Sequence, residues 1–180
     1  MLEPVNKFKM NSKKGVIWVS AVLYILISLA VLSLVLVSVQ PIINKNQDKA
    51  VLYQSESILR EIDSTIQDVS DNEGTILNLD IKISRGNLII NSSNNRIGFE
   101  LKDSSYQYSE EDKYITTGKI TSYSKKINGK WYVLMYLDYQ GKYNLTYSGL
   151  KNNRVFSEGD YVLALENMNA ATNSVDIRAS

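Results

Sequence analysis

The arrangement of apolar residues along the chain first marks out one long segment. From Val16 to Val39 almost every residue is apolar, and no charged side chain occurs from Gly15 to Asn44. As an α-helix, this segment would be about 36 Å long, enough to cross a hydrocarbon core of roughly 30 Å. The run is typical of a transmembrane helix and exceeds the apolar part of a cleaved secretory signal, which has about 7 to 15 residues.

After this segment the spacing becomes that of an amphipathic helix. Pro41 ends the apolar run, and inside a helix it would remove one backbone hydrogen bond and favour a kink. The apolar residues that recur at helical spacing are Val51, Leu52, Ile58, Leu59, Ile62, Ile66 and Val69. The charged residues, expected largely on the other faces, are Glu56, Arg60, Glu61, Asp63 and Asp68. We therefore expect the helix to continue to about residue 73, before the stop signal at Gly74.

From Thr75 onward the period of the pattern changes to two, which indicates strands. Roughly seven or eight are predicted, at Leu77–Ile83, Asn87–Ile90, Ile97–Leu101, Tyr114–Ser124, Lys130–Tyr139, Tyr143–Tyr147, Asp160–Leu165 and Ser174–Ile177. Asn128-Gly129 and Gln140-Gly141 are hairpin signals between them. The predicted class is α+β: a long hydrophobic N-terminal helix, apolar in its first half and amphipathic in its second, packed on an antiparallel β-sheet or β-sandwich head.

The charge distribution predicts how this helix is oriented. Residues 1–14 carry Lys7, Lys9, Lys13 and Lys14 against Glu3, whereas the whole chain has a net charge of only +1. Lysines flanking a membrane helix favour the cytoplasmic side. We expect a cytoplasmic N-terminus in the membrane-inserted chain and an extracellular head at the cell surface. Because no strong basic field covers the chain, no nucleic-acid partner is expected.

The junction Lys13-Lys14-Gly15, directly before an apolar helix that starts at Val16, resembles the class III signal peptide of type IV pilin-like proteins, especially archaeal pilins and archaellins. In that family a prepilin peptidase cuts after the glycine, and the helix remains as membrane anchor and later as filament core. The resemblance implies a leader (1–15), a transmembrane or filament-core helix (16–40), its amphipathic continuation (41–73) and a β-rich head (74–180). Bacterial pilins carry glutamate at the fifth mature position, which here is Ser20, so the resemblance is to the archaeal branch.

The function implied by the resemblance is that of a structural subunit of an extracellular filament. Its partners would be the membrane, the prepilin peptidase, and copies of itself or other pilins. Small residues that let helices approach closely are Ala21, Ser28, Ala30, Ser33 and Ser38. Two alternatives stay open: a single-pass anchored binding module that never polymerises, and a minor pilin. Adhesion, motility and DNA uptake are all compatible with the pattern.

The composition points away from catalysis. The chain has no cysteine and no histidine, which removes the commonest nucleophiles, general bases and soft metal ligands. We expect no catalytic residue, no cofactor and no metal site. Asn91 and Asn144 begin the triplets Asn91-Ser92-Ser93 and Asn144-Leu145-Thr146 and are candidates for N-glycosylation. Ten of the twelve tyrosines follow residue 105; we expect them mainly as half-buried strand residues, with an aromatic surface for sugars or subunits as the alternative.

Overall fold

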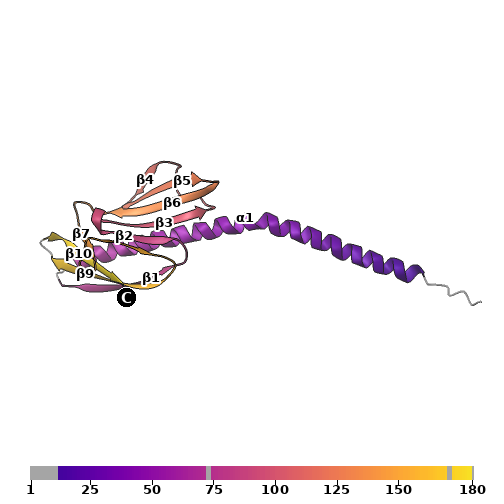
Figure 1. The fold of residues 1–180 in the computed structure, drawn as a ribbon, viewed down its shortest axis with the longest axis horizontal. Coiled ribbons are helices and arrows are strands. Elements are labelled where there is room, and N and C mark those ends of the chain that lie inside the picture. Colours follow the sequence, from indigo (N-terminus) through magenta and orange to yellow (C-terminus); the bar gives the residue numbers. More distant parts are fainter. Residues whose placement is uncertain (1–11, 72–73, 170–171, 180) are drawn as a thin grey trace, which may run out of the picture. The chain divides into compact units, whose positions relative to one another are not determined.

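One long helix precedes the strands in the described part of the chain (Figure 1). The computed structural model describes residues 12–71, 74–169 and 172–179, and of residues 12–17 the backbone alone. Helix α1 runs from Ser12 to Ser70 with Pro41 inside it. The chain divides into two compact units, Met1–Ile43 and Asn44–Ser180. The second half of α1 therefore belongs to the same unit as the strands.

Ten strands in the described residues form two sheets. In spatial order, the four-stranded sheet contains β1 (Ile76–Ile83), β9 (Gly159–Asn169), β10 (Ser174–Ala179) and β7 (Asn144–Tyr147). The six-stranded sheet contains β4 (Tyr114–Thr117), β5 (Ile120–Ile127), β6 (Lys130–Asp138), β3 (Arg96–Ser104), β2 (Asn87–Asn91) and β8 (Asn153–Phe156). A short 3₁₀ helix, η1 (Ser92–Asn94), joins β2 to β3. The predicted class, a long helix on a β-rich head, is confirmed.

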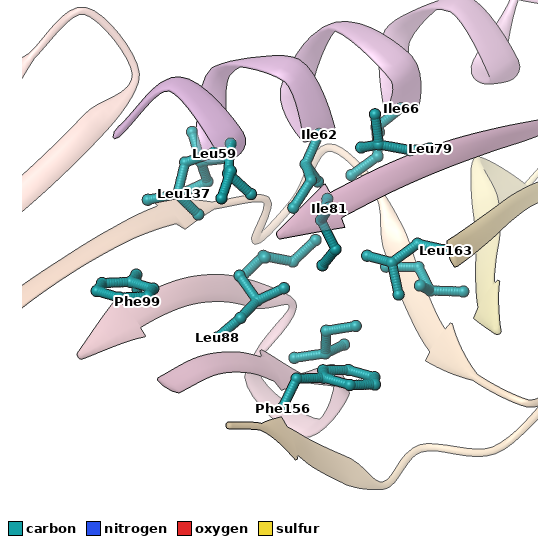
Figure 2. Packing of buried hydrophobic residues seen from close by; sticks show 14 of the residues in the cluster. Leu59, Ile62, Ile66, Leu79, Ile81, Leu88, Phe99, Leu137, Phe156 and Leu163 are labelled. Carbon is teal, nitrogen blue, oxygen red and sulfur yellow. The ribbon is translucent and has the colours of Figure 1, made fainter. Parts of the chain in front are cut away.

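One hydrophobic core joins the second half of α1 to both sheets (Figure 2). Figure 2 shows Leu59, Ile62 and Ile66 of the helix directed toward side chains of the strands. Each fully buried aliphatic side chain contributes roughly 1.5–3 kcal/mol to folding. The predicted apolar stripe is confirmed: Leu52, Ile58, Leu59, Ile62, Ile66 and Val69 are buried, and Val51 is half-buried.

The strands bury alternate residues, as the period of two predicts. In β1 the buried side chains are Leu79, Ile81 and Ile83, and in β6 they are Val133, Met135 and Leu137. Successive side chains of a strand point to opposite faces, so each sheet presents one apolar face to the core. The opposite face of the six-stranded sheet carries tyrosines and charged residues.

The head departs from the predicted strands and turns in four places. Gln140-Gly141 is not a hairpin turn, because β6 and β7 lie in different sheets. The single strand predicted at Tyr114–Ser124 is wrong: the chain forms the hairpin β4–β5 there. Its two-residue loop begins at Gly118, whose φ of +64° is readily available to glycine. β8 was not predicted, because a four-residue strand that begins Asn-Arg shows no alternation. β7 and β10 pair in parallel, which the intervening β8 and β9 permit as a long crossover.

One predicted surface residue is buried. Asp63, expected on a polar face of the helix, is only 9% exposed. Its carboxylate accepts hydrogen bonds from Lys119 Nζ at 2.7 Å, Tyr139 OH at 3.1 Å and Gln67 Nε2 at 2.8 Å. Burial, together with the charge of Asp63, raises the pKa of Tyr139 far above its ordinary value, so its phenol remains a donor. Asp63 therefore fastens the helix to the six-stranded sheet and the segments that extend from it.

Replacing Asp63 with asparagine tests this attachment. The amide keeps the size of the side chain but loses the charge that Lys119 and Tyr139 contact. We expect Asp63→Asn to lower the free energy of unfolding by about 1.5–3 kcal/mol, measured by urea titration of the full chain in detergent with near-ultraviolet circular dichroism. Asp68→Asn, an exposed position on the same helix, should change it by less than about 0.5 kcal/mol. Equal effects of the two substitutions would show that Asp63 is not an anchor.

Candidate functional site

The first half of α1 exposes its apolar side chains on every side. All residues from Trp18 to Ile43 are exposed, with Trp18 at 75% and Val37 at 74%. Among the described residues, one helix is long and apolar enough to span a membrane; its best window has a mean hydropathy of 2.8 and is 0% buried. This part of the helix is the candidate membrane span and the candidate functional site.

A helix with this surface is suited to a nonpolar surrounding. Soluble monomers rarely expose contiguous apolar patches larger than a few hundred Å², and here the apolar surface continues around the helix. The backbone of an α-helix satisfies most of its own hydrogen bonds, which allows the segment to enter lipid. Pro41 has no N–H, so the carbonyl of Val37 lacks its usual intrahelical donor. Lipid or other apolar helices are therefore the surroundings that this surface fits.

The serines of the segment do not oppose such burial. The hydroxyls of Ser28, Ser33 and Ser38 donate to the carbonyl oxygens of Tyr24, Leu29 and Leu34 at 2.8, 2.8 and 2.9 Å. Each hydroxyl thus has a partner one turn earlier in the same helix. These positions combine small size with a satisfied polar group, which suits close approach of another helix.

The five small residues nominated for helix packing are spread around the helix. At about 100° per residue, Ala21 and Ser28 share one face. Ala30 lies on the opposite face from Ala21, and Ser33 and Ser38 lie on the two flanks between them. A helix that pairs with one partner would gain from a single stripe of small residues. Their distribution instead suits a helix with neighbours on several sides.

The predicted processing site lies at the start of the helix. α1 begins at Ser12, so the backbone of Lys13, Lys14 and Gly15 forms its first turn, and Val16 begins the next. The first four N–H groups of a helix have no intrahelical partner, and glycine favours the helix by about 1 kcal/mol less than alanine. A peptidase would therefore have to open only the weakest end of α1. Residues 1–11 lie outside the described part, as do the side chains of residues 12–17.

The second half of α1 carries further polar contacts that the sequence pattern missed. Asp48 is 1% exposed and accepts hydrogen bonds from Arg85 Nη1 and from the backbone N–H of Ser105. Tyr108 OH donates to Glu56 Oε2 at 2.6 Å, and this bond holds the pKa of the Glu56 carboxyl below its ordinary value. Helical periodicity places such residues on a polar face and does not show which strand or loop covers it.

The two glycosylation triplets differ in their surroundings. Asn91 ends β2 and caps η1: its Oδ1 accepts from the Asn94 backbone N–H at 3.0 Å, and Ser93 is exposed. Asn144 begins β7, and the Thr146 hydroxyl of its triplet donates to the buried Asp176 at 2.6 Å. Both asparagines lie in the head, far along the chain from the apolar segment.

The acidic residues of the head do not gather into a cation site. Asp176 accepts from Thr146, from the Gly149 backbone N–H at 2.7 Å and from Arg178 Nε at 2.9 Å, so protein donors already neutralise it. Within the described residues, no group of three or more acidic side chains is placed to hold a metal ion. No protein-family profile, curated protein or solved structure matches the chain. Its function is therefore inferred from the geometry of the described residues.

The surroundings of the two triplets predict unequal glycosylation. In a host that glycosylates folded proteins, the Asn91 triplet is more accessible, because it lies at a turn and its Ser93 is exposed. The Asn144 triplet is part of a strand, and its threonine hydroxyl is engaged. We expect a higher occupancy at Asn91, measured by mass spectrometry of proteolytic peptides. Equal or higher occupancy at Asn144 would contradict the prediction.

Proposed function

We propose that the chain is a pilin-like structural subunit of a type IV pilus-like filament. The proposal rests on the difference in exposure between the two halves of α1. Its residues from Trp18 to Ile43 are exposed and largely apolar around the whole circumference, whereas its second half buries one face in the head. A helix fixed to a folded head at one end and free over an apolar length at the other has the form that a filament subunit requires.

The precursor would first use the apolar segment as a membrane anchor. Lys7, Lys9, Lys13 and Lys14 keep the N-terminus on the cytoplasmic side, and the head lies outside. The prepilin peptidase would then cut after Gly15 at the cytoplasmic face. Removal of the leader takes the lysines away, and with them the charges that hold this end of the helix at the membrane surface.

Polymerisation would move Val16–Val39 from lipid into a bundle of identical helices. Because lipid tails and leucine side chains are similarly apolar, this transfer gains little from the hydrophobic effect. The gain must come from close packing, for which small residues on all sides are useful. The hydroxyls of Ser28, Ser33 and Ser38, already bonded within the helix, would pass between the two surroundings at little cost.

The contacts between residues 44–70 of α1 and the head would resist the tension on a filament subunit. Pulling residues 44–70 out of the head would separate Asp48 from Arg85 and Asp63 from Lys119, leaving charges without partners. Each hydrogen bond to a charged group contributes about 1.5–3 kcal/mol. The head would therefore stay attached to its helix while the filament is under tension.

A second candidate is a non-polymerising, single-pass anchored binding module. The observation that favours it is the outer face of the six-stranded sheet, where Tyr132 and Tyr136 are only half-buried. Half-buried aromatic side chains are common at binding surfaces. The membrane segment would then serve as an anchor alone, and its small residues would have no packing role. A minor pilin would share the processing and packing of the first candidate.

Cleavage after Gly15 is the first test of the proposed pilin-like function. Protein from the native host should begin at Val16, as read by N-terminal sequencing and intact-mass measurement. Gly15→Leu should block the cut, because the added side chain stiffens the first turn and fills the position next to the scissile bond. The variant should still insert into the membrane, since its apolar segment is unchanged. A wild-type protein that retains residues 1–15 would contradict the proposal.

Phenylalanine substitutions in the apolar segment distinguish a filament subunit from a single-pass anchored binding module. Ala21→Phe, Ser28→Phe and Ala30→Phe keep the segment apolar, so insertion and cleavage should survive. In a packed bundle an added ring costs about 1–3 kcal/mol at each contact, a cost repeated in every subunit. At least one variant should accumulate as processed, membrane-held monomer, with filaments reduced at least tenfold in electron micrographs.

Leu23→Phe and Leu29→Phe are the matched controls, because they exchange one large apolar side chain for another in the same segment. They should leave filament number within about twofold of wild type. If all five variants form filaments equally well, packing through small residues is not used. If wild type forms no filament, alone or with partner pilins, the anchored binding module is the correct function.

A further inference from the structure

The outer face of the six-stranded sheet contains an aromatic hollow, which is independent of the apolar helix. It encloses about 450 Å³, within the range of roughly 300–1,000 Å³ found for small-molecule sites. Residues from β2, β3, β4, β6 and η1 line it, and those that matter most here are Gly98, Tyr114, Tyr132, Tyr136, Arg96 and Asn91. All of them belong to the unit formed by residues 44–180.

The hollow exists because the central strand β3 has no side chain at its floor. Gly98 pairs with Ile89 of β2 and with Tyr136 of β6, and the absence of a side chain lets β6 come close to β3 there. A Cβ atom added at Gly98 would approach Met135 O to 2.9 Å and Tyr136 Cβ to 3.0 Å. Glycine in the interior of a strand often marks a close approach by a ligand or another backbone.

Three tyrosines make the walls of the hollow. Tyr132 and Tyr136 come from β6, four positions apart and therefore on the same face. Tyr114 comes from β4; it is 66% exposed, and its ring stacks on Tyr123 with centroids 4.8 Å apart. The walls thus combine aromatic rings with phenol groups that donate and accept hydrogen bonds, and Tyr123 and Arg96 take up part of the ring surfaces of Tyr114 and Tyr136.

The charges at the rim cancel one another. Arg96 Nη2 and Nε lie 2.6 and 2.9 Å from Asp138 Oδ2, and the guanidinium lies 5.0 Å from the centroid of the Tyr136 ring. Beside it, Glu100 pairs with Lys102 at 3.3 Å and accepts a hydrogen bond from Tyr132 OH. With each acid paired to a base, the rim favours an uncharged ligand over a phosphate or a nucleotide.

We propose that this hollow binds a neutral saccharide. A pyranose ring has an apolar C–H face, which fits against tyrosine rings, and a rim of hydroxyls, which fits guanidinium, amide and phenol groups. The hollow offers both: aromatic walls around a floor without a side chain, and Arg96, Asn91 and Tyr132 at its edge. An apolar site with a few convergent polar groups is the usual form of a small-molecule pocket.

Two sources would supply a saccharide of this chemistry. One is a glycan of another molecule. The other is a glycan attached to Asn91, which lines the hollow and begins the triplet Asn91-Ser92-Ser93. The Nδ2 group of Asn91, where a glycan would be joined, has no hydrogen bond within the described residues, whereas its Oδ1 holds the Asn94 backbone N–H. The site is independent of the proposed filament and can be measured on the detergent-held monomer.

Saturation-transfer difference NMR tests the proposal on the full chain. The chain would be produced in a host without N-glycosylation and kept in lauryldimethylamine oxide, a detergent without a sugar headgroup. The probes are glucose, galactose, mannose, N-acetylglucosamine and their common disaccharides. We expect at least one of them to receive saturation through its ring protons. Tyr136→Ala and Tyr114→Ala should each weaken its binding at least tenfold.

Tyr114 is exposed on an edge strand, so Tyr114→Ala is expected to fold normally even if Tyr136→Ala does not. Tyr53→Ala, at an exposed tyrosine of α1 that does not line the hollow, is the matched control and should bind like wild type. The proposal is overturned if no probe receives saturation. It is also overturned if the Tyr114 and Tyr136 variants bind as tightly as the control.

A glycosylated preparation then identifies the source. Ser93→Ala removes the acceptor triplet without changing Asn91. If added sugar binds glycosylated Ser93→Ala protein but not the glycosylated wild type, the glycan on Asn91 fills the hollow. If both bind it equally, the ligand is a glycan of another molecule. Both results support a saccharide site; a hollow filled in filaments by a neighbouring protein segment would contradict it.

Discussion

A helix that is apolar around its whole circumference cannot remain in water, and this constraint governs how the protein is organised. Between Trp18 and Ile43 every residue is exposed. The backbone of the segment is satisfied internally except at Pro41, and the hydroxyls of Ser28, Ser33 and Ser38 are bonded to carbonyls one turn earlier. What the segment still needs is a nonpolar surrounding for its exposed apolar side chains. Lipid and a bundle of like helices both provide one.

The second half of the same helix is held in place by contacts with the head. The head covers one of its faces, which includes two charged side chains. Asp48 and Asp63 are buried, and each is paired with a base from the head. Apolar contacts alone would allow the helix to slide by a turn, since Leu, Ile and Val fill similar spaces. A carboxylate paired with one lysine or arginine fixes a single position, as buried polar groups do in other helical assemblies.

The sequence predicts the parts of this structure whose signals are local. Length and hydropathy predict the apolar helix, and a helical period predicts the stripe from Leu52 to Val69. A period of two predicts most strands. The pairing of β7 with β10, the short strand β8 and the burial of Asp63 depend on contacts between distant residues, which no local pattern contains. The aromatic hollow belongs to this second group: Gly98 and Tyr136 are separate signals until the register of β3 and β6 brings them together.

We propose that the apolar half of α1 passes from lipid into a bundle of copies outside the membrane. The most direct measurement shears surface appendages from native-host cells, collects them without detergent and determines the mass of the chain that they contain. We expect filaments that can be pelleted. Their subunits should retain residues 16–39, although no lipid or detergent covers this segment. Recovery of the chain only in the membrane fraction, or release only of fragments that have lost residues 16–39, would contradict it.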